Sequence, residues 1–147
     1  MTEVSLTSLY QELILEHYRN PRNQRELADS TAEARVANPV CGDEITVQIL
    51  LDGERIEDVA FDGHGCAISQ ASVSMMTDLV RGSERSEAIR LANIFTDMMH
   101  GSEGASSDRS LGDLRALEGV SNFPVRIRCA LLAFDALREA LGDGPGG

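Results

Sequence analysis

Basic residues are scarce in this chain, which has 13 Lys and Arg against 24 Asp and Glu and a formal net charge of −11. Nucleic acids and anionic membrane surfaces attract positive charge, so this deficit argues against non-specific binding to either of them. An acidic surface suits a partner with a basic docking surface, but acidity is also common among cytosolic proteins. We therefore expect neither a nucleic acid nor a membrane as partner.

Long apolar segments are also missing. No stretch reaches the roughly 18 apolar residues typical of a membrane-spanning helix. The N-terminus reads MTEVS and lacks the basic start and apolar core of a signal peptide, which favours a cytoplasmic protein. With 147 residues, 42% of them hydrophobic, the chain fits one folded domain. We predict that this domain covers residues 1–141 and that the Gly-rich residues 142–147 form a disordered tail.

The spacing of apolar residues predicts strands between helical segments. Strands are expected from alternating patterns at 34–37, 44–51 and 55–62. Helices are expected from helical periods and turn residues at 7–18, 69–80, 83–99, 111–117 and 124–141. Asp52-Gly53 is a hairpin signal, and Ser83 or Ser86 is the expected cap of the third long helix. The predicted fold class is α+β: a three-stranded antiparallel sheet packed against a layer of helices, with an N-terminal helix and a long C-terminal helix.

Cysteine is rare too, and the three residues present contain no C-x-x-C pair. An odd number cannot pair fully within the chain, and sparse cysteines in a reducing compartment are typically metal-binding or catalytic. The competing interpretation is three unrelated buried thiols, because free cysteine is often a small core residue. Local context favours a site: Cys41 and Cys66 lie in glycine-flanked turns, and Cys129 falls in the second turn of the last predicted helix.

Three thiolates and one carboxylate form a donor set that suits tetrahedral zinc. Asp43, two residues after Cys41, is one candidate for the fourth ligand. His64 is the rival, because histidine is the commoner zinc ligand and this residue lies two positions before Cys66. Arg126 and Arg128 precede Cys129 and are placed to offset the negative charge of such a site, unless both are solvated on the helix surface.

Four segments together resemble the IscU/NifU-like family of iron–sulfur cluster scaffold proteins. They are residues 16–23 (EHYRNPRN), 38–43 (NPVCGD), 63–69 (GHGCAIS) and the helix with Cys129. Within this family the chain most resembles the SufU branch. It has Arg128 where IscU has a histidine, NFPVR at 122–126 where IscU has an LPPVK chaperone-docking segment, and a longer spacer between Cys66 and Cys129.

The resemblance implies a zinc-dependent sulfurtransferase. By position, Cys41, Asp43, Cys66 and Cys129 would be the zinc ligands, and Arg128 would lie just outside them. Cys41 would accept persulfide sulfur from a SufS-type, pyridoxal-phosphate-dependent cysteine desulfurase and relay it to downstream iron–sulfur assembly proteins. We expect Cys41 to be the mobile ligand, because a loop residue leaves a metal more easily than a mid-helix one.

Two rival functions remain from the sequence. An IscU-type scaffold could hold a [2Fe–2S] cluster on the three cysteines and Asp43, and the purified protein would then be brown. A purely structural zinc domain would protect Cys41 from alkylation as firmly as Cys66 and Cys129. A colourless protein with stoichiometric zinc, in which Cys41 reacts selectively, is the outcome that the resemblance to SufU predicts.

Overall fold

A three-stranded antiparallel sheet forms one layer of the domain. This computed structural model describes residues 6–102 and 104–142. The strands β1 (Ala32–Asn38), β2 (Asp43–Asp52) and β3 (Arg55–His64) pair in the order β1-β2-β3. Alternation sets the face of each side chain: Ile45, Val47 and Ile49 are fully buried, whereas Thr46 and Gln48 between them are half-buried. The sheet therefore has one covered face, and the predicted fold class is confirmed.

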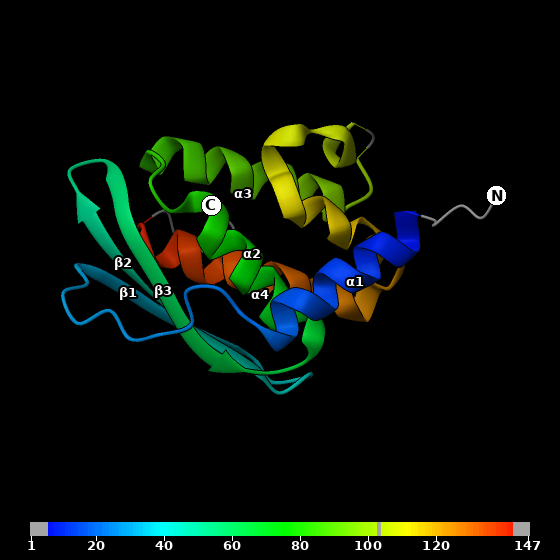
Figure 1. Cartoon of the computed structure of the whole chain (residues 1–147), viewed down its shortest axis with the longest axis horizontal. Coiled ribbons are helices and arrows are strands. Elements are labelled where there is room, and N and C mark those ends of the chain that lie inside the picture. Colours follow the sequence, from blue (N-terminus) through cyan, green and yellow to red (C-terminus); the bar gives the residue numbers. More distant parts are fainter. Residues whose placement is uncertain (1–5, 103, 143–147) are drawn as a thin grey trace.

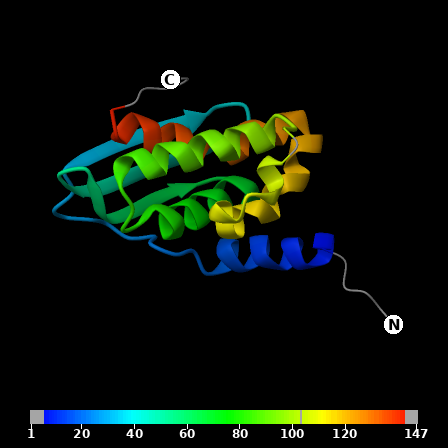
Figure 2. The same ribbon diagram turned by 90° about the horizontal axis from the view of Figure 1, so that it is seen from above.

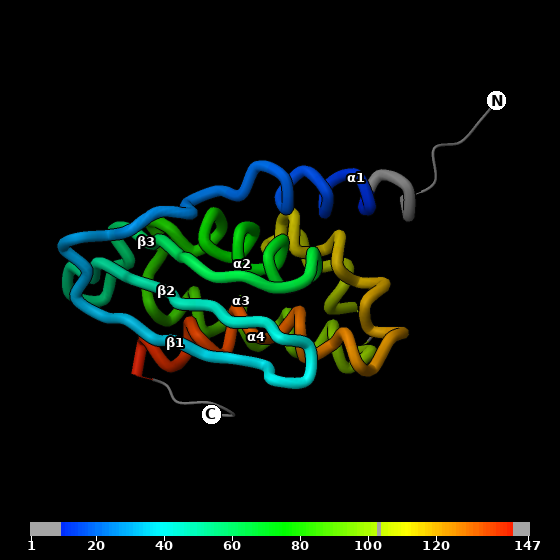
Figure 3. The backbone as a smooth tube through the Cα atoms, turned by 90° about the horizontal axis from the view of Figure 1, so that it is seen from below, coloured from blue at the N-terminus to red at the C-terminus, as the bar shows by residue number. Residues whose placement is uncertain are grey.

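Helices cover that face in two tiers (Figures 1 and 2). The four α-helices are α1 (Leu6–Arg19), α2 (Ala67–Val80), α3 (Arg85–Met99) and α4 (Pro124–Ala140), and the 3₁₀ segments are η1 (Ala105–Ser107) and η2 (Arg109–Asn122). Helix α4 packs on β1 and β2, and α2 packs on β3. Helix α1 lies against α2 and η2, and α3 against α4 and η2, as the view through the sheet shows (Figure 3).

The core lies between the sheet and these helices. Helix α2 contributes Val73, Met76 and Val80, all fully buried. Phe134 of α4 stacks on Phe95 of α3 with ring centroids 4.7 Å apart, which joins the two tiers. Removing either ring would leave a cavity that costs about 3–5 kcal/mol of stability.

Some boundaries differ from the sequence prediction. Helix α3 begins at Arg85 with Glu84 in the N-cap position, so the predicted serine cap was wrong. The Ser83 hydroxyl instead donates to the Val80 carbonyl at 2.7 Å, at the end of α2. Strand β1 is longer than residues 34–37 because it pairs with β2 along its whole length, from Ala32 to Asn38. The predicted tail lies outside the described residues except for Gly142.

Membrane insertion of a helix was not expected from the sequence. Within residues 6–102 and 104–142, no helix combines the length and apolar character needed to cross a bilayer.

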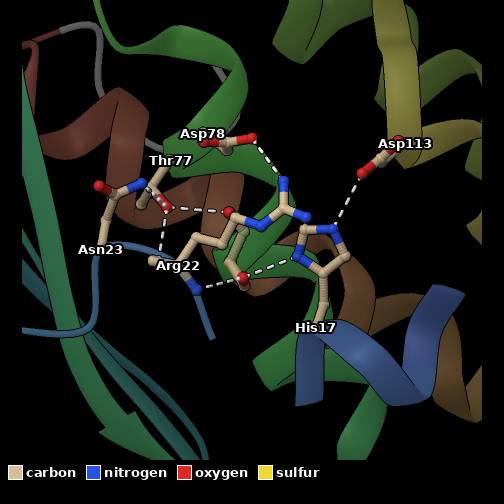
Figure 4. A network of polar contacts seen from close by, with 7 residues as sticks. His17, Arg22, Asn23, Thr77, Asp78 and Asp113 are labelled. Atoms are coloured by element: carbon tan, nitrogen blue, oxygen red, sulfur yellow. Dashed lines mark hydrogen bonds and ion pairs between the residues drawn. The ribbon is translucent and has the colours of Figure 1, made fainter. Parts of the chain in front are cut away.

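A buried polar network holds α1 on the body of the domain (Figure 4). His17 is 1% exposed, and its Nδ1 lies 2.8 Å from Ser74 Oγ of α2 while its Nε2 lies 2.9 Å from Asp113 Oδ2 of η2. A carboxylate only accepts, so His17 Nε2 donates to Asp113, and in the neutral imidazole Nδ1 then accepts from Ser74. The Arg22 N–H donates to the same Ser74 oxygen at 2.8 Å, which ties the loop after α1 to α2 as well.

Candidate metal centre

Cys41 is presented by the tight turn between β1 and β2. The carbonyl of Asn38 accepts the N–H groups of Cys41 (3.2 Å) and Gly42 (2.9 Å), and the Asn38 Oδ1 accepts the N–H of Val40 at 3.3 Å. Gly42 has a φ of +72°, which glycine adopts without steric cost. The turn leaves Cys41 partly exposed and the neighbouring Val40 81% exposed.

Asp43, the first residue of β2, is buried with its two carboxylate oxygens in different situations. Oδ1 accepts the Cys66 N–H at 2.8 Å, whereas Oδ2 is buried and has no hydrogen-bond partner among the described residues. The residue is 1% exposed, so its free oxygen is also shielded from water. An ionised buried carboxylate is costly unless a cation or a set of donors compensates it. One oxygen of Asp43 is therefore oriented by the chain while the other remains available to a cation.

Gly65 makes this close approach possible. A Cβ at this position would lie 2.3 Å from Asp43 Oδ1 and 2.7 Å from Ser69 Oγ, and its φ of +154° is disfavoured for other residues. The glycine before Cys66 that marked this turn in the sequence is therefore required for steric reasons.

Cys66 occupies the N-cap position of α2, between this turn and the helix. Its backbone N–H is the donor to Asp43, and its thiol lies 3.9 Å from Ser69 Oγ. No side chain caps the start of this helix.

Cys129 is fully buried in the second turn of α4, as predicted. Its Sγ lies 3.2 Å from Cys41 Sγ, well beyond the ~2.05 Å of a disulfide. Burial raises the pKa of the Cys129 thiol above its ordinary value, and the neighbouring Cys41 and Asp43 raise it further. A thiolate at this position therefore needs a positive partner.

The ligand atoms of Cys41, Asp43 and Cys129 all lie within 4.8 Å of one another. Tetrahedral zinc with Zn–S bonds of ~2.3 Å and Zn–O bonds of ~2.0 Å separates its ligand atoms by about 3.5–3.8 Å, so the three donors need only small shifts. Two thiols and a carboxylate with one unpaired buried oxygen therefore fit a zinc-like cation. Cys66, the other predicted ligand, is not among these three grouped donors, although it lies close enough to act on the Cys129 thiol. We call the three donors and the adjoining Cys66 the thiol cluster.

The remaining predicted candidates lie around the thiol cluster. His64, at the end of β3, is exposed and is not one of the three grouped donors, which favours Asp43 over its rival. Arg126 is exposed, and hydrogen bonding to Cys129 together with the charge of Cys66 raises the pKa of its guanidinium. Arg128 is exposed, and its charge acts on Asp135 farther along α4.

An apolar groove of about 520 Å³ adjoins the thiol cluster, and the sequence did not predict it. It is lined by Tyr10, Gln11, Ile14, Ile68, Ala116, Glu118, Gly119, Val120, Phe123 and Arg126. These residues come from α1, α2, η2 and the start of α4, so no local pattern in the sequence marks them as neighbours. Phe123 is 62% exposed and Val125 is 64% exposed, which gives this side of the cluster an apolar surface.

Most of the chain matches the sequence model of one protein family. The model of the NifU-like N terminal domain matches residues 9–143. This match includes all four residues of the thiol cluster.

Named relatives match over nearly the same length. The chain is 46% identical to the zinc-dependent sulfurtransferase SufU of Bacillus subtilis, over 97% of this chain and 96% of that protein. It is 43% identical to the iron–sulfur cluster assembly scaffold protein IscU of Streptococcus pyogenes, over 92% of this chain and 84% of the relative. A crystal structure of a SUF-system iron–sulfur cluster assembly scaffold protein from Fervidobacterium islandicum superposes with a TM-score of 0.82 at 34% identity, covering 88% of this chain and 94% of that one.

Proposed function

This chain belongs to the family of NifU-like N-terminal domains, and we propose that it works as a zinc-dependent sulfurtransferase. It belongs among the iron–sulfur cluster assembly proteins of the SufU/IscU type. In the proposed reaction, Cys41 accepts persulfide sulfur from a SufS-type cysteine desulfurase and passes it to downstream assembly proteins. The setting of this reaction would be the cytoplasm.

One observation supports the metal above all others. Asp43 is buried with one oxygen fixed by the Cys66 N–H and the other unpaired beside two thiols. Cys41, Asp43, Cys66 and Cys129 would hold the zinc ion. Bound zinc would keep the coordinated sulfurs deprotonated at neutral pH and so supply a ready nucleophile. The zinc dependence of the Bacillus subtilis relative agrees with this donor set.

The three cysteines differ in how firmly the surrounding structure holds them, and this difference suggests their roles. Cys129 is buried within α4, and Cys66 is anchored by its backbone N–H to Asp43. Cys41 instead lies on a turn and is partly exposed, so its side chain can rotate outward without unwinding a helix. Cys41 is therefore the proposed acceptor, and Cys66 and Cys129 are the proposed fixed ligands.

Sulfur transfer to Cys41 needs no external oxidant. The Cys41 thiolate attacks the outer sulfur of the donor persulfide, a new S–S bond forms on Cys41, and the donor S–S bond breaks. The donor cysteine leaves as a thiolate, so one thiolate and one persulfide are present before and after the step. Arg126, whose pKa the neighbouring cysteines raise, would stabilise the negative charge that remains at the cluster, and Arg128 is the second candidate for this role.

The second candidate function is assembly of a [2Fe–2S] cluster on the same residues. The three cysteines and the IscU name of the Streptococcus pyogenes relative favour it. Metal analysis and the visible spectrum of the purified protein separate the two functions. Stoichiometric zinc in a colourless protein supports sulfur transfer, whereas iron with visible absorbance supports the cluster scaffold.

The deciding experiment for sulfur transfer measures desulfurase turnover with and without this protein, on samples of known zinc content. We expect strong stimulation that disappears both in the zinc-free protein and in Cys41→Ala. Stimulation that survives the Cys41→Ala substitution would contradict the proposal. Alkylation of Cys41 in preference to Cys66 and Cys129, when the desulfurase is present, would separate a sulfur carrier from a structural zinc domain.

A further inference from the structure

Asn38, the last residue of β1, is buried although half of its side chain has no partner. The residue is 4% exposed. Its Oδ1 accepts the Val40 N–H at 3.3 Å, which identifies the other terminal atom as the Nδ2 donor. In the described part of the chain, this Nδ2 makes no hydrogen bond. Buried donors are nearly always satisfied, so an orphaned one suggests a partner that arrives later.

Asn38 lies next to residues of the thiol cluster. Asn38 and Asp43 are direct cross-strand partners, so their side chains leave the same face of the sheet. Helix α4, which carries Cys129, packs on β1 and β2. The carbonyl of Asn38 also holds the N–H of Cys41 at 3.2 Å. The unused donor is therefore attached to the residue that closes the Cys41 turn.

We propose that the Asn38 amide donates a hydrogen bond to the sulfur of Cys41 after that thiolate leaves the cluster, and to the persulfide that it becomes. This inference rests on the acceptor role of Cys41 proposed above. Cys41 Sγ lies 3.2 Å from Cys129 Sγ, and the Asn38 Nδ2 donates to no other group within residues 6–102 and 104–142. When the Cys41 thiolate rotates away from Cys129, it loses the interactions that it makes inside the cluster. A hydrogen bond from the amide of Asn38, in the same turn, would compensate for this loss.

The two ends of the Asn38 side chain have separable roles. Oδ1 supports the turn through Val40, whereas Nδ2 takes no part in the turn. Asn38→Ser keeps a short oxygen acceptor near the Val40 N–H but loses the longer amide donor. Asn38→Asp keeps the shape and the acceptor, and replaces the donor with a second acceptor. If the serine variant does not fold, the aspartate variant still distinguishes donor from turn support.

The test measures the rate at which Cys41 gains one sulfur atom, by mass spectrometry, together with zinc content and unfolding temperature. Sulfur is supplied in one arm by the desulfurase and in the other by inorganic polysulfide. We expect Asn38→Ser and Asn38→Asp to bind stoichiometric zinc but to gain sulfur about tenfold or more slowly in both arms, because hydrogen bonds to charged groups are the strong ones. Asn20→Ser, at an exposed asparagine that follows α1 and hydrogen-bonds the exposed Glu16 side chain, is the matched control and should react like the wild type.

Two results would overturn this inference. Either both Asn38 variants gain sulfur at the wild-type rate, or they lose zinc and sulfur uptake together, in which case the residue only builds the turn. Failure of the proposed function looks different: the wild-type protein then takes no sulfur from the desulfurase, while the polysulfide arm still decides the role of Asn38.

Discussion

Two buried polar clusters in this domain differ in how completely their atoms are paired. In the His17 network, both ring nitrogens of His17 have partners, and Ser74 Oγ is shared with the Arg22 N–H. In the thiol cluster and its turn, Asp43 Oδ2 and Asn38 Nδ2 have no hydrogen-bond partner in the part of the chain that the structure describes. A fully paired cluster stabilises one arrangement of the chain, whereas an incompletely paired one is ready to bind something else.

The comparison also shows why residue types alone do not define a site. His17, Ser74 and Asp113 have the composition of a serine-hydrolase triad and lie in hydrogen-bonding order. Ser74, however, is fully buried, and its oxygen already accepts the Arg22 N–H. No substrate can reach this oxygen, so the network is structural. Helix α2 connects the clusters, because Cys66 is its N-cap residue and Ser74 lies about two turns later.

The largest expected effect is the loss of sulfur uptake in Cys41→Ala. The substitution removes the proposed acceptor from an exposed turn and should leave the fold intact, since no core residue is changed. We expect sulfur transfer from the desulfurase to fall to the background of the assay. The unfolding temperature should fall less than in Cys129→Ala, because Cys41 lies on a partly exposed turn and three proposed zinc ligands remain. A Cys41→Ala protein that still carried a persulfide would assign the acceptor role to another cysteine.

The next effect should be the loss of both metal and stability in Cys129→Ala. This thiol is fully buried beside the Asp43 carboxylate, so losing the metal would leave a buried charge uncompensated. Breaking such a pairing costs about 3 kcal/mol or more. Zinc content and urea unfolding of the purified variant measure the two losses. Chelation of zinc from the wild type should reproduce the fall in stability but leave Cys129→Ala nearly unchanged.

A smaller effect, confined to stability, is expected in the other cluster. His17→Ala leaves the buried Ser74 hydroxyl without its acceptor, at a cost of about 1–3 kcal/mol, whereas water can replace His17 at Asp113, whose side chain is 44% exposed. Because the network touches no thiol, zinc stoichiometry should not change. Urea unfolding of the zinc-loaded protein measures the difference. If His17→Ala lost zinc instead, the two clusters would be coupled through α2, and the contrast between them would fail.

The same contrast explains what the sequence could predict. Strands, long helices and the fold class followed from local periodicity, and the turns with Cys41 and Cys66 were marked by adjacent glycines. The structure brings Cys41, Asp43 and Cys129 together, although their role as ligands stays a prediction. The partners of His17 lie 57 and 96 residues away, and no local pattern specifies such contacts. Likewise, the start of α3 at Arg85 was missed because Glu84 takes the cap position without a side-chain bond.

The smallest effect should come from a polar group that is paired at the surface. Asp58 is partly buried, which opposes its ionisation, but the bonds from Arg25 and the Val59 N–H outweigh burial and hold its pKa below the ordinary value. Arg25 Nη2 lies 2.7 Å from Asp58 Oδ1 and Arg81 Nε lies 3.1 Å from it.

A lowered pKa in the folded state means that this carboxylate stabilises the protein above the unfolded pKa of about 3.9 and that the gain is lost as the pH falls through the folded pKa. Both arginines are largely exposed, so Asp58→Asn should cost only about 0.5–1 kcal/mol at pH 7. Urea unfolding at pH 7 and below pH 4 should show this difference shrinking with acidification. A difference that persisted in acid, or that exceeded the cost of His17→Ala, would mean that burial does not determine how much a paired polar group stabilises this domain.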